Sequence, residues 1–190
     1  MFFVLLFLFC FNIDANIGTA GFKDYPNYYF VETGTFNGYG VERALHAGCF
    51  KEIYSIEVDQ KFVNENLYRF RNFKNVFIRH GNANNNLWNI IKNLDKPITF
   101  WLDAHVYPGK EGEQNCPLLE ELEQIKMHPI KTHTILIDDM SCSGTIHFDY
   151  ITKDDLIEKI KEINPNYKIK YIVGGNDDEA KDNIMLAYIE

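Results

Sequence analysis

The fold of the chain is set by one stretch near its start, which reads YYFVETGTFNGYG over residues 28–40. Its first part, residues 28–33, is rich in apolar, aromatic and β-branched side chains, a pattern that indicates a buried strand. Gly34 follows at once, and residues 38–47 then show the spacing of a helix, with Gly48 as its stop. The stretch therefore predicts a strand, a glycine-rich turn and a helix in direct succession.

The same alternation of strand and helix continues along the chain. Further strands are expected over residues 53–58, 76–79, 98–102 and 134–137, and further helices over residues 61–72, 85–94, 152–163 and from Pro117 onward. Residues 168–173 and 184–189 show strand patterns with no helical pattern between them, so they are expected to form an antiparallel hairpin. Five strand–helix repeats predict an α/β fold: a Rossmann-like, doubly wound, mostly parallel seven-stranded sheet with helices on both faces and a C-terminal antiparallel hairpin.

The turn after the first strand has the features of a nucleoside-binding turn. Gly34 and Gly38 let the backbone approach a ligand closely, but the turn has neither the GxGxxG spacing of a dinucleotide site nor the Lys of a P-loop. Glu32 beside the turn would repel a pyrophosphate and attract a cation, such as the amino and sulfonium groups of S-adenosylmethionine. Glu57 lies 23 residues beyond Gly34, at about the distance where an acid accepts hydrogen bonds from ribose hydroxyls. The alternative is that both acids are ordinary solvated strand ends.

Composition and charge restrict the classes of protein that fit the sequence. The 190 residues are 46% apolar and 24% charged, as in an ordinary globular protein, and they suffice for one domain, expected over residues 28–190. Nineteen Lys and Arg against 27 Asp and Glu give a net charge of −8, which disfavours nucleic acid as a partner. Four cysteines without a CxxC pair support neither a zinc site nor a disulfide framework.

The first 27 residues differ from the rest in composition. Residues 2–11 read FFVLLFLFCF, and the first basic residue is Lys23. The run is too short to span a membrane and resembles the apolar region of a secretory signal, with Ala15 or Ala20 at a cleavage site, although a basic stretch before it is missing. Residues 1–27 are therefore a signal or membrane anchor, or alternatively a helix or strand packed on the domain.

From residue 28 onward, the chain resembles the class I S-adenosylmethionine-dependent methyltransferases. The matching motifs follow successive strands and read VETGTFNGYG, IEVD, HGNAN, LDAH and IDDM, and the terminal hairpin also matches. The resemblance implies S-adenosylmethionine as cofactor, bound by Glu32, Gly34, Thr35, Phe36, Gly38, Glu57, Asn82, Ala83 and Asp103. It places Asn82 and Ala83 beside the adenine, although the third loop usually carries an acid where this chain has Asn82.

Within this class, the acids after the fourth and fifth strands are most similar to those of metal-dependent O-methyltransferases. The pair Asp138-Asp139 is similar to that of the macrocin-type sugar O-methyltransferases, whereas the catechol and caffeoyl-CoA types usually have Asp-Asn. The resemblance implies transfer of a methyl group to a hydroxyl of a sugar, a glycan or another small molecule.

The acids themselves point to a metal ion. Adjacent parallel strands lie about 4.8 Å apart, so Asp103, Asp138 and Asp139 can reach one ion. Three crowded carboxylates repel one another, and a divalent cation relieves that repulsion. Hard oxygen ligands without cysteine favour Mg²⁺, with Mn²⁺ or Ca²⁺ as alternatives. Simple strand-end solvation or a helix cap would explain Asp138 and Asp139 without a metal.

Asp103 and His105 are the predicted catalytic residues. A cation held by Asp103 would lower the pKa of an acceptor hydroxyl and orient its oxygen. His105 follows Asp103 by two residues, the same-face spacing of an extended chain, and suits the role of general base or further ligand. The alternative is a solvent-exposed loop histidine. The polar loop over residues 106–115 is expected to close over substrate as a lid.

Two other functions stay open on the sequence alone. One is methyl transfer to a phenol, a protein side chain or RNA, although the fourth strand lacks the Asn/Asp-Pro-Pro-Tyr run common in amino-group methylation. The other is a non-catalytic domain that binds a small molecule. Because S-adenosylmethionine is made in the cytosol, the domain is expected to face that pool, with residues 2–11 as a membrane tether.

Overall fold

The computed structural model describes residues 21–105, 116–173 and 183–190 of the chain. The apolar run over residues 2–11 and the expected lid over residues 106–115 lie outside the described residues. Within these described ranges, every helix is too short or too polar to span a membrane.

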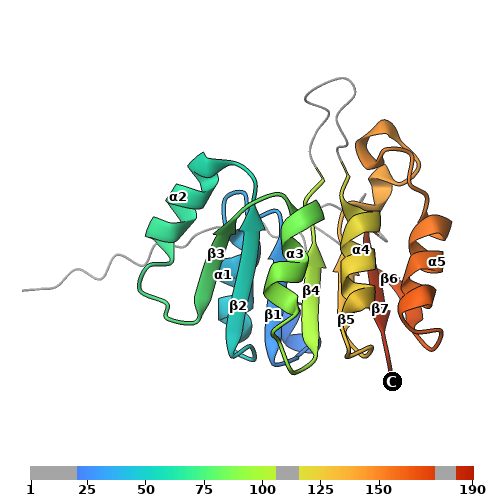
Figure 1. The fold of residues 1–190 in the computed structure, drawn as a ribbon, viewed down its shortest axis with the longest axis horizontal. Coiled ribbons are helices and arrows are strands. Elements are labelled where there is room, and N and C mark those ends of the chain that lie inside the picture. Colours follow the sequence, from blue (N-terminus) through green and yellow to red (C-terminus); the bar gives the residue numbers. More distant parts are fainter. Residues whose placement is uncertain (1–20, 106–115, 174–182) are drawn as a thin grey trace, which may run out of the picture.

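Seven strands form one sheet in the order β3-β2-β1-β4-β5-β7-β6 (Figure 1). The strands are β1 (Tyr29–Thr33), β2 (Glu52–Glu57), β3 (Val76–His80), β4 (Ile98–Leu102), β5 (Thr134–Ile137), β6 (Lys168–Ile172) and β7 (Ile184–Tyr188). The first five strands are parallel, while β7 runs antiparallel to both β5 and β6. The predicted fold class is therefore confirmed, with β7 inserted between β5 and β6.

Helices cover both faces of the sheet (Figure 1). They are α1 (Tyr39–Ala47), α2 (Gln60–Arg69), α3 (Ala83–Ile91), α4 (Leu118–Met127) and α5 (Lys153–Ile163), with short 3₁₀ turns η1 (Phe22–Asp24), η2 (Met140–Cys142) and η3 (Ile146–Phe148). Helices α3, α4 and α5 pack on one face, and α1, α2 and η1 pack on the other. This is the two-sided layering expected when parallel strands are joined by crossover helices.

Some helix ends follow capping signals rather than the apolar pattern. α3 begins at Ala83, earlier than its apolar stripe predicts, because the Asn82 side chain accepts a hydrogen bond from a first-turn amide. α5 begins after Thr152, which forms a reciprocal capping box with Asp155. The helix predicted over residues 61–72 ends at Arg69.

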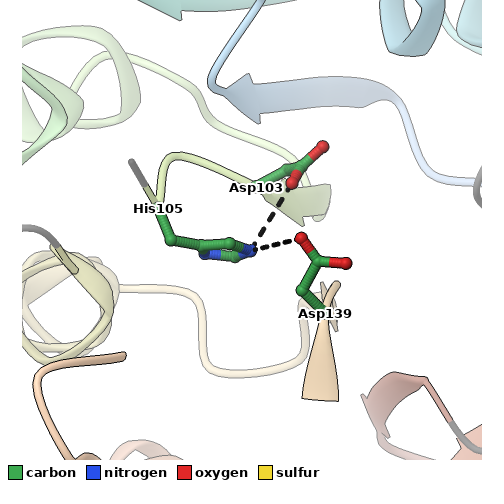
Figure 2. Close-up of side chains that lie close together, drawn as sticks. All are labelled: Asp103, His105 and Asp139. Atoms are coloured by element: carbon green, nitrogen blue, oxygen red, sulfur yellow. Dashed lines mark ion pairs between the residues drawn. The ribbon is translucent and has the colours of Figure 1, made fainter. Parts of the chain in front are cut away.

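The carboxyl ends of the parallel strands lie at one edge of the sheet, at the top of Figure 1. The first residue after each of four strands donates a backbone hydrogen bond to the neighbouring strand: Gly34 to Ile56 (2.9 Å), Gly81 to Glu57 (2.9 Å), Asp103 to Thr33 (3.1 Å) and Asp138 to Leu102 (3.2 Å). The loops that carry the sequence motifs are therefore fixed side by side. Asp103 after β4 and Asp139 after β5 come together at this edge (Figure 2).

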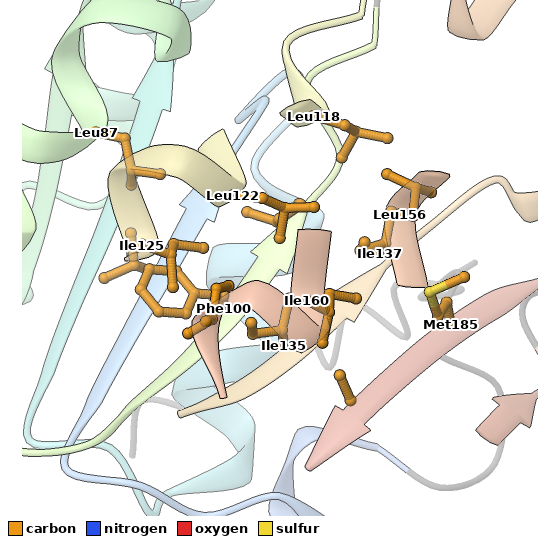
Figure 3. Close-up of a cluster of buried hydrophobic side chains, with 14 of the residues drawn as sticks. Leu87, Phe100, Leu118, Leu122, Ile125, Ile135, Ile137, Leu156, Ile160 and Met185 are labelled. Carbon is orange, nitrogen blue, oxygen red and sulfur yellow. The ribbon is translucent and has the colours of Figure 1, made fainter. Parts of the chain in front are cut away.

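The core that holds this edge in place consists of two apolar clusters. The larger one lies between the sheet and α3–α5, and includes Phe100, Leu122, Ile135 and Ile160 (Figure 3). The smaller one lies under α1, α2 and η1, and includes Phe22, Phe30, Val41 and Trp101. Burial of each such large side chain contributes about 1.5–3 kcal/mol to folding stability. The two clusters therefore hold in place the strands whose ends carry the site residues.

Candidate active site

Gly34 marks the point where the strand order reverses, because β1 lies between β2 and β4. Its φ is +83°, and a Cβ at this position would lie 2.3 Å from the backbone oxygen of Asp103. Only glycine allows this approach. The predicted cofactor turn after β1 and the predicted catalytic loop after β4 are therefore in direct contact.

Glu32 lies behind the glycine turn and is buried, so it is not the solvated strand-end acid of the alternative interpretation. It is 1% exposed, and a Cβ on Gly40 of α1 would lie 1.7 Å from its Oε1. Ser55 donates a hydrogen bond to Glu32 and shares another, of 2.6 Å, with Thr35. Burial raises the pKa of Glu32 to about 8, against the opposing effect of the Ser55 hydrogen bond. At neutral pH this carboxyl is mainly uncharged.

Glu57 fixes the shape of the glycine turn. Its Oε2 accepts a hydrogen bond from the Phe36 backbone amide at 2.8 Å, and its Oε1 accepts one from the Asp59 amide at 2.8 Å. Each carboxylate oxygen has a second lone pair, so Glu57 can still accept hydrogen bonds from ligand hydroxyls. Its position at the end of β2 is the one that the sequence predicted for a ribose partner.

Asn66 is a positioning residue that the sequence analysis missed. It is 2% exposed on α2, and its amide donates to the backbone oxygens of Phe36 (2.7 Å) and Phe62 (2.9 Å). A Cβ on Gly38 would lie 2.1 Å from its Oδ1, so the turn and α2 interlock. The sequence does contain a signal for Asn66: it lies three residues after Val63, which places a polar side chain on the apolar face of α2.

The other predicted cofactor residues follow β1 and β3. Thr35 is buried, whereas Phe36 is exposed, with a φ of +42° and its ring 4.6 Å from that of Phe62. Asn82 is exposed at the start of α3, where its side chain caps the helix, and Ala83 is buried behind it. Asn82 thus has a structural task in addition to any contact with a ligand.

A cavity opens between α1, η1 and the ends of β1 and β4. Its walls include Phe22, Glu32, Gly34, Arg43, Trp101 and Asp103. It therefore joins the glycine turn to the acid after β4, the two places where the sequence predicted cofactor and catalytic chemistry.

His105, Asp103 and Asp139 form a compact group beside this cavity (Figure 2). The Nε2 atom of His105 lies 3.5 Å from Asp103 Oδ1 and 3.5 Å from Asp139 Oδ2. The His105 side chain is 6% exposed, and neither ring nitrogen has a hydrogen-bond partner among the residues that the structure describes. The expected same-face placement of Asp103 and His105 is confirmed.

The two acids of this group have opposite titration behaviour. Burial, reinforced by the nearby Asp138 and Asp139 carboxyls, raises the pKa of Asp103 well above its usual range. The His105 ring lowers the pKa of Asp139 below its usual range. Asp139 is thus an anion, while Asp103 is shifted toward its neutral form unless a positive charge is bound beside it.

Asp138, the third predicted ligand, is not among the three residues whose ligand atoms lie within 4.8 Å of one another. Its side chain is fully buried, and its Oδ1 accepts a hydrogen bond of 2.8 Å from the Asp139 amide. Both residues follow the end of β5, and Asp139 has a left-handed φ of +55°, so this backbone turn rather than strand alternation sets the directions of the two side chains. His105, two residues after Asp103, takes the third position instead.

Two further histidines, His128 and His133, have structural surroundings. His133 is buried, accepts from the Ile98 amide (3.1 Å) and lies 3.1 Å from His128, and burial lowers its pKa to about 3. Burial also raises the pKa of Cys142, which does not favour a thiolate nucleophile.

Comparison with known proteins identifies the fold. No protein-family model matches the sequence, and no curated protein matches it. An O-methyltransferase from Bacillus cereus in complex with S-adenosylhomocysteine is 18% identical, with 89% of this chain and 77% of that chain covered and a TM-score of 0.58. The O-methyltransferase TomG from Streptomyces achromogenes, involved in tomaymycin synthesis and in complex with S-adenosylmethionine, is 16% identical (88% and 75% covered, TM-score 0.59).

An rRNA methylase from Streptococcus thermophilus is also similar, at 17% identity, with 88% of this chain and 92% of that chain covered and a TM-score of 0.55. The chain thus has the fold of the class I S-adenosylmethionine-dependent methyltransferases, as its motifs predicted. Because these similar structures include both O-methyltransferases and an rRNA methylase, the fold by itself does not specify the acceptor.

Proposed function

We propose that the chain is an S-adenosylmethionine-dependent O-methyltransferase. The observation that carries the proposal is the contact between the glycine turn and the Asp103–His105–Asp139 group, made through Gly34 and the backbone of Asp103. This contact would place a cofactor on the turn next to groups able to activate a hydroxyl.

The residues around the turn fit the cofactor. When bound, S-adenosylmethionine supplies a methyl group on a positively charged sulfur. Glu57 has free lone pairs for ribose hydroxyls, and the glycines at 34 and 38 let the turn pack directly against the Asp103 backbone and Asn66. The turn is already fixed by Glu57 and Asn66, so little ordering would accompany binding, and alignment alone can contribute about 7–11 kcal/mol to lowering a barrier.

The Asp103–His105–Asp139 group also fits a divalent cation. Its three ligand atoms lie within 4.8 Å of one another, and the buried ring nitrogens of His105 lack hydrogen-bond partners within the described part of the chain. A cation held there lowers the pKa of a bound hydroxyl and orients its oxygen. The two carboxylates suit Mg²⁺, and the imidazole in place of Asp138 makes Mn²⁺ a strong competitor.

The same residues can act without a metal. In that case Nε2 of His105 accepts the proton of the acceptor hydroxyl as a general base, and Asp139 stabilises the resulting imidazolium from 3.5 Å. The two versions differ in their response to chelation, because only the first needs a bound ion.

The proposed acceptor is a hydroxyl of a sugar, a glycan or another small molecule, supported by the Asp138-Asp139 pair that resembles macrocin-type enzymes. The net charge of −8 argues against nucleic acid. Since S-adenosylmethionine is made in the cytosol, the domain is proposed to face that pool, with residues 2–11 as a candidate membrane tether.

The test is methyl transfer from labelled S-adenosylmethionine to a panel of sugars, polyols, catechols and phenols. We expect Asp103→Asn, which keeps the shape of the neutral acid, to lower the rate about 10²–10⁴-fold. The control Asp154→Asn changes an exposed acid on α5 and should leave the rate unchanged.

Chelation then separates the two versions of the mechanism. Loss of transfer in EDTA with recovery in Mn²⁺ or Mg²⁺ supports the metal, whereas transfer that resists EDTA but needs His105 supports the general base. Cofactor binding without transfer to any member of the panel would contradict the proposal and favour a binding domain.

A further inference from the structure

Arg43 is a half-buried cation that the proposed chemistry does not use. It lies on α1 and lines the cavity together with Glu32, Trp101 and Asp103. Its Nε and Nη1 atoms are shielded from solvent and have no hydrogen-bond partner among the described residues. A guanidinium carries five N–H donors, so this position leaves strong donors unused beside a cavity.

Shielding the Nε and Nη1 atoms of Arg43 without acceptors lowers stability unless a bound ligand supplies hydrogen-bond acceptors. A buried charged donor without an acceptor loses its hydration and gains nothing in exchange. Burial lowers the pKa of Arg43, and the nearby Asp138 charge raises it in part. The two acids in the cavity wall, Glu32 and Asp103, do not supply these acceptors, since neither forms a hydrogen bond with Nε or Nη1 of Arg43.

The position of Arg43 indicates which part of a ligand it would meet. Along the sheet, Glu57 ends β2, Gly34 follows β1, and the cavity lies toward β4. A nucleoside whose ribose is held by Glu57 extends across Gly34 toward the cavity with its other end. In S-adenosylmethionine that end is an α-amino acid with a carboxylate, the planar anion to which a guanidinium binds through two parallel hydrogen bonds.

We propose that Arg43 binds the carboxylate of the methionine moiety of S-adenosylmethionine and makes the cavity selective for nucleosides that carry it. The inference rests on the proposed function and deepens it, since it assigns a specificity-determining residue to the cofactor site. The carboxylate would supply the acceptors that Nε and Nη1 lack in the unliganded chain.

The test measures, by calorimetry, the affinity of the full chain for two ligands that differ in one group. One is S-adenosylhomocysteine, and the other is its decarboxylated analogue, which keeps the adenosine, the sulfur and the amine. We expect the wild type to bind S-adenosylhomocysteine about 10- to 100-fold more tightly than the analogue, as for other hydrogen bonds between charged groups. Arg43→Gln should lose this preference while binding the analogue as the wild type does.

Two further variants keep the test specific. Arg43→Lys retains the charge without the planar pair of donors and should show a reduced preference. Arg71→Gln alters an exposed arginine that bonds to the Tyr68 backbone, away from the cavity, and should keep the full preference. The unfolding midpoint of ligand-free Arg43→Gln should not fall, because the variant removes a charged group whose Nε and Nη1 are shielded and without acceptors.

Several results would overturn the inference. If the wild type binds both ligands equally, the carboxylate is not recognised. If Arg43→Gln weakens both ligands by the same factor, Arg43 only supports the fold of the cavity. In both cases the proposed methyltransferase function stands, whereas a wild type that binds neither ligand contradicts that function as well.

Discussion

The two halves of the candidate site differ in how their polar groups are satisfied. On the β1–β2–β3 side, the chain bonds its own groups: both oxygens of Glu57 accept backbone hydrogen bonds, and the amide of Asn66 donates two. On the β4–β5 side and in the adjoining cavity, the ring nitrogens of His105 and two nitrogens of Arg43 have no hydrogen-bond partner in the described residues.

This difference separates a scaffold from a reactive region. Each buried polar group without a partner costs about 1–3 kcal/mol, so a chain tolerates such groups mainly where another task requires them. The first half is complete as folded and can hold a ligand without rearrangement. The second half is completed by what binds to it, which is where catalysis and specificity are expected.

The largest effect is expected at Gly34, where the two halves touch. Gly34→Ala combines a left-handed φ with a Cβ 2.3 Å from the Asp103 backbone, so we expect a loss of about 3–5 kcal/mol in unfolding free energy. Gly144→Ala is the matched control: its φ is +75° but no atom lies within 4 Å, so only the backbone strain of about 1–2 kcal/mol applies. Denaturant unfolding measures both, and equal losses would mean that the close approach is unimportant.

The next effect concerns Glu121, a buried acid on α4 outside the Asp103–His105–Asp139 group. Burial raises its pKa to about 8, so between pH 5 and pH 8 the unfolded chain releases a proton that the folded chain keeps. Stability therefore falls as pH rises through this window. Glu121→Gln removes this contribution and should be a few kcal/mol more stable than the wild type at pH 8, with the difference vanishing near pH 4.

The pKa of Glu32 is also raised, so the stability of Glu121→Gln should still fall with rising pH, but less than that of the wild type. Glu158→Gln, at an exposed position on α5, is the control and should follow the wild-type curve. Denaturant titrations at several pH values give the unfolding free energies. If those of the wild type and Glu121→Gln changed with pH in parallel, the raised pKa of Glu121 would be contradicted.

A bound cation should stabilise the folded chain through its ligands in the β4–β5 half. At a Mn²⁺ or Mg²⁺ concentration 100 times its dissociation constant, the wild type should gain about 2.7 kcal/mol and unfold at a higher temperature. His105→Ala removes one of the three ligands and should lose most of that shift. Thermal unfolding with and without EDTA checks this, and an equal shift in the variant would exclude His105 as a ligand.

A smaller effect is expected on the scaffold side. Asn66→Ala leaves the Phe36 and Phe62 carbonyls without their donor, so we expect a loss of about 1–2 kcal/mol in stability and weaker binding of S-adenosylhomocysteine. Asn64→Ala, at an exposed position on the same helix, should change neither quantity. Unchanged cofactor affinity in Asn66→Ala would show that the turn keeps its shape without α2.

The fold was accessible from the sequence because its signals are local and repeated. The apolar run of β4 and the stripe of α5 predict their elements directly, and five such repeats leave few topologies. The order of the last two strands was less accessible: the pattern of residues 168–173 and 184–189 predicts a hairpin but not that β7 enters beside β5. That choice depends on contacts between distant parts of the chain.

The site was predicted less completely, because spacing along the chain gives the position of a side chain but only partly its direction. The same-face rule correctly grouped Asp103 with His105. The adjacency of Asp138 and Asp139 did not show that Asp139 has a left-handed backbone and that Asp138 is fully buried. The alternative of a solvated Glu32 is wrong, because β1 is covered on both faces. Arg43 gave no sequence signal, since a lone arginine on a helix is ordinarily solvated.

The place of β7 in the sheet has a consequence for biosynthesis. β6 is joined to the sheet only through β7, although it leaves the ribosome earlier, and Ile137 of β5 pairs with Met185. Until residues 184–188 emerge, the nascent chain carries an open edge on β5 and an unattached β6 strand. Such edges recruit other extended chains, so the interval before residues 184–188 emerge is when this domain is most exposed to wrong strand pairing.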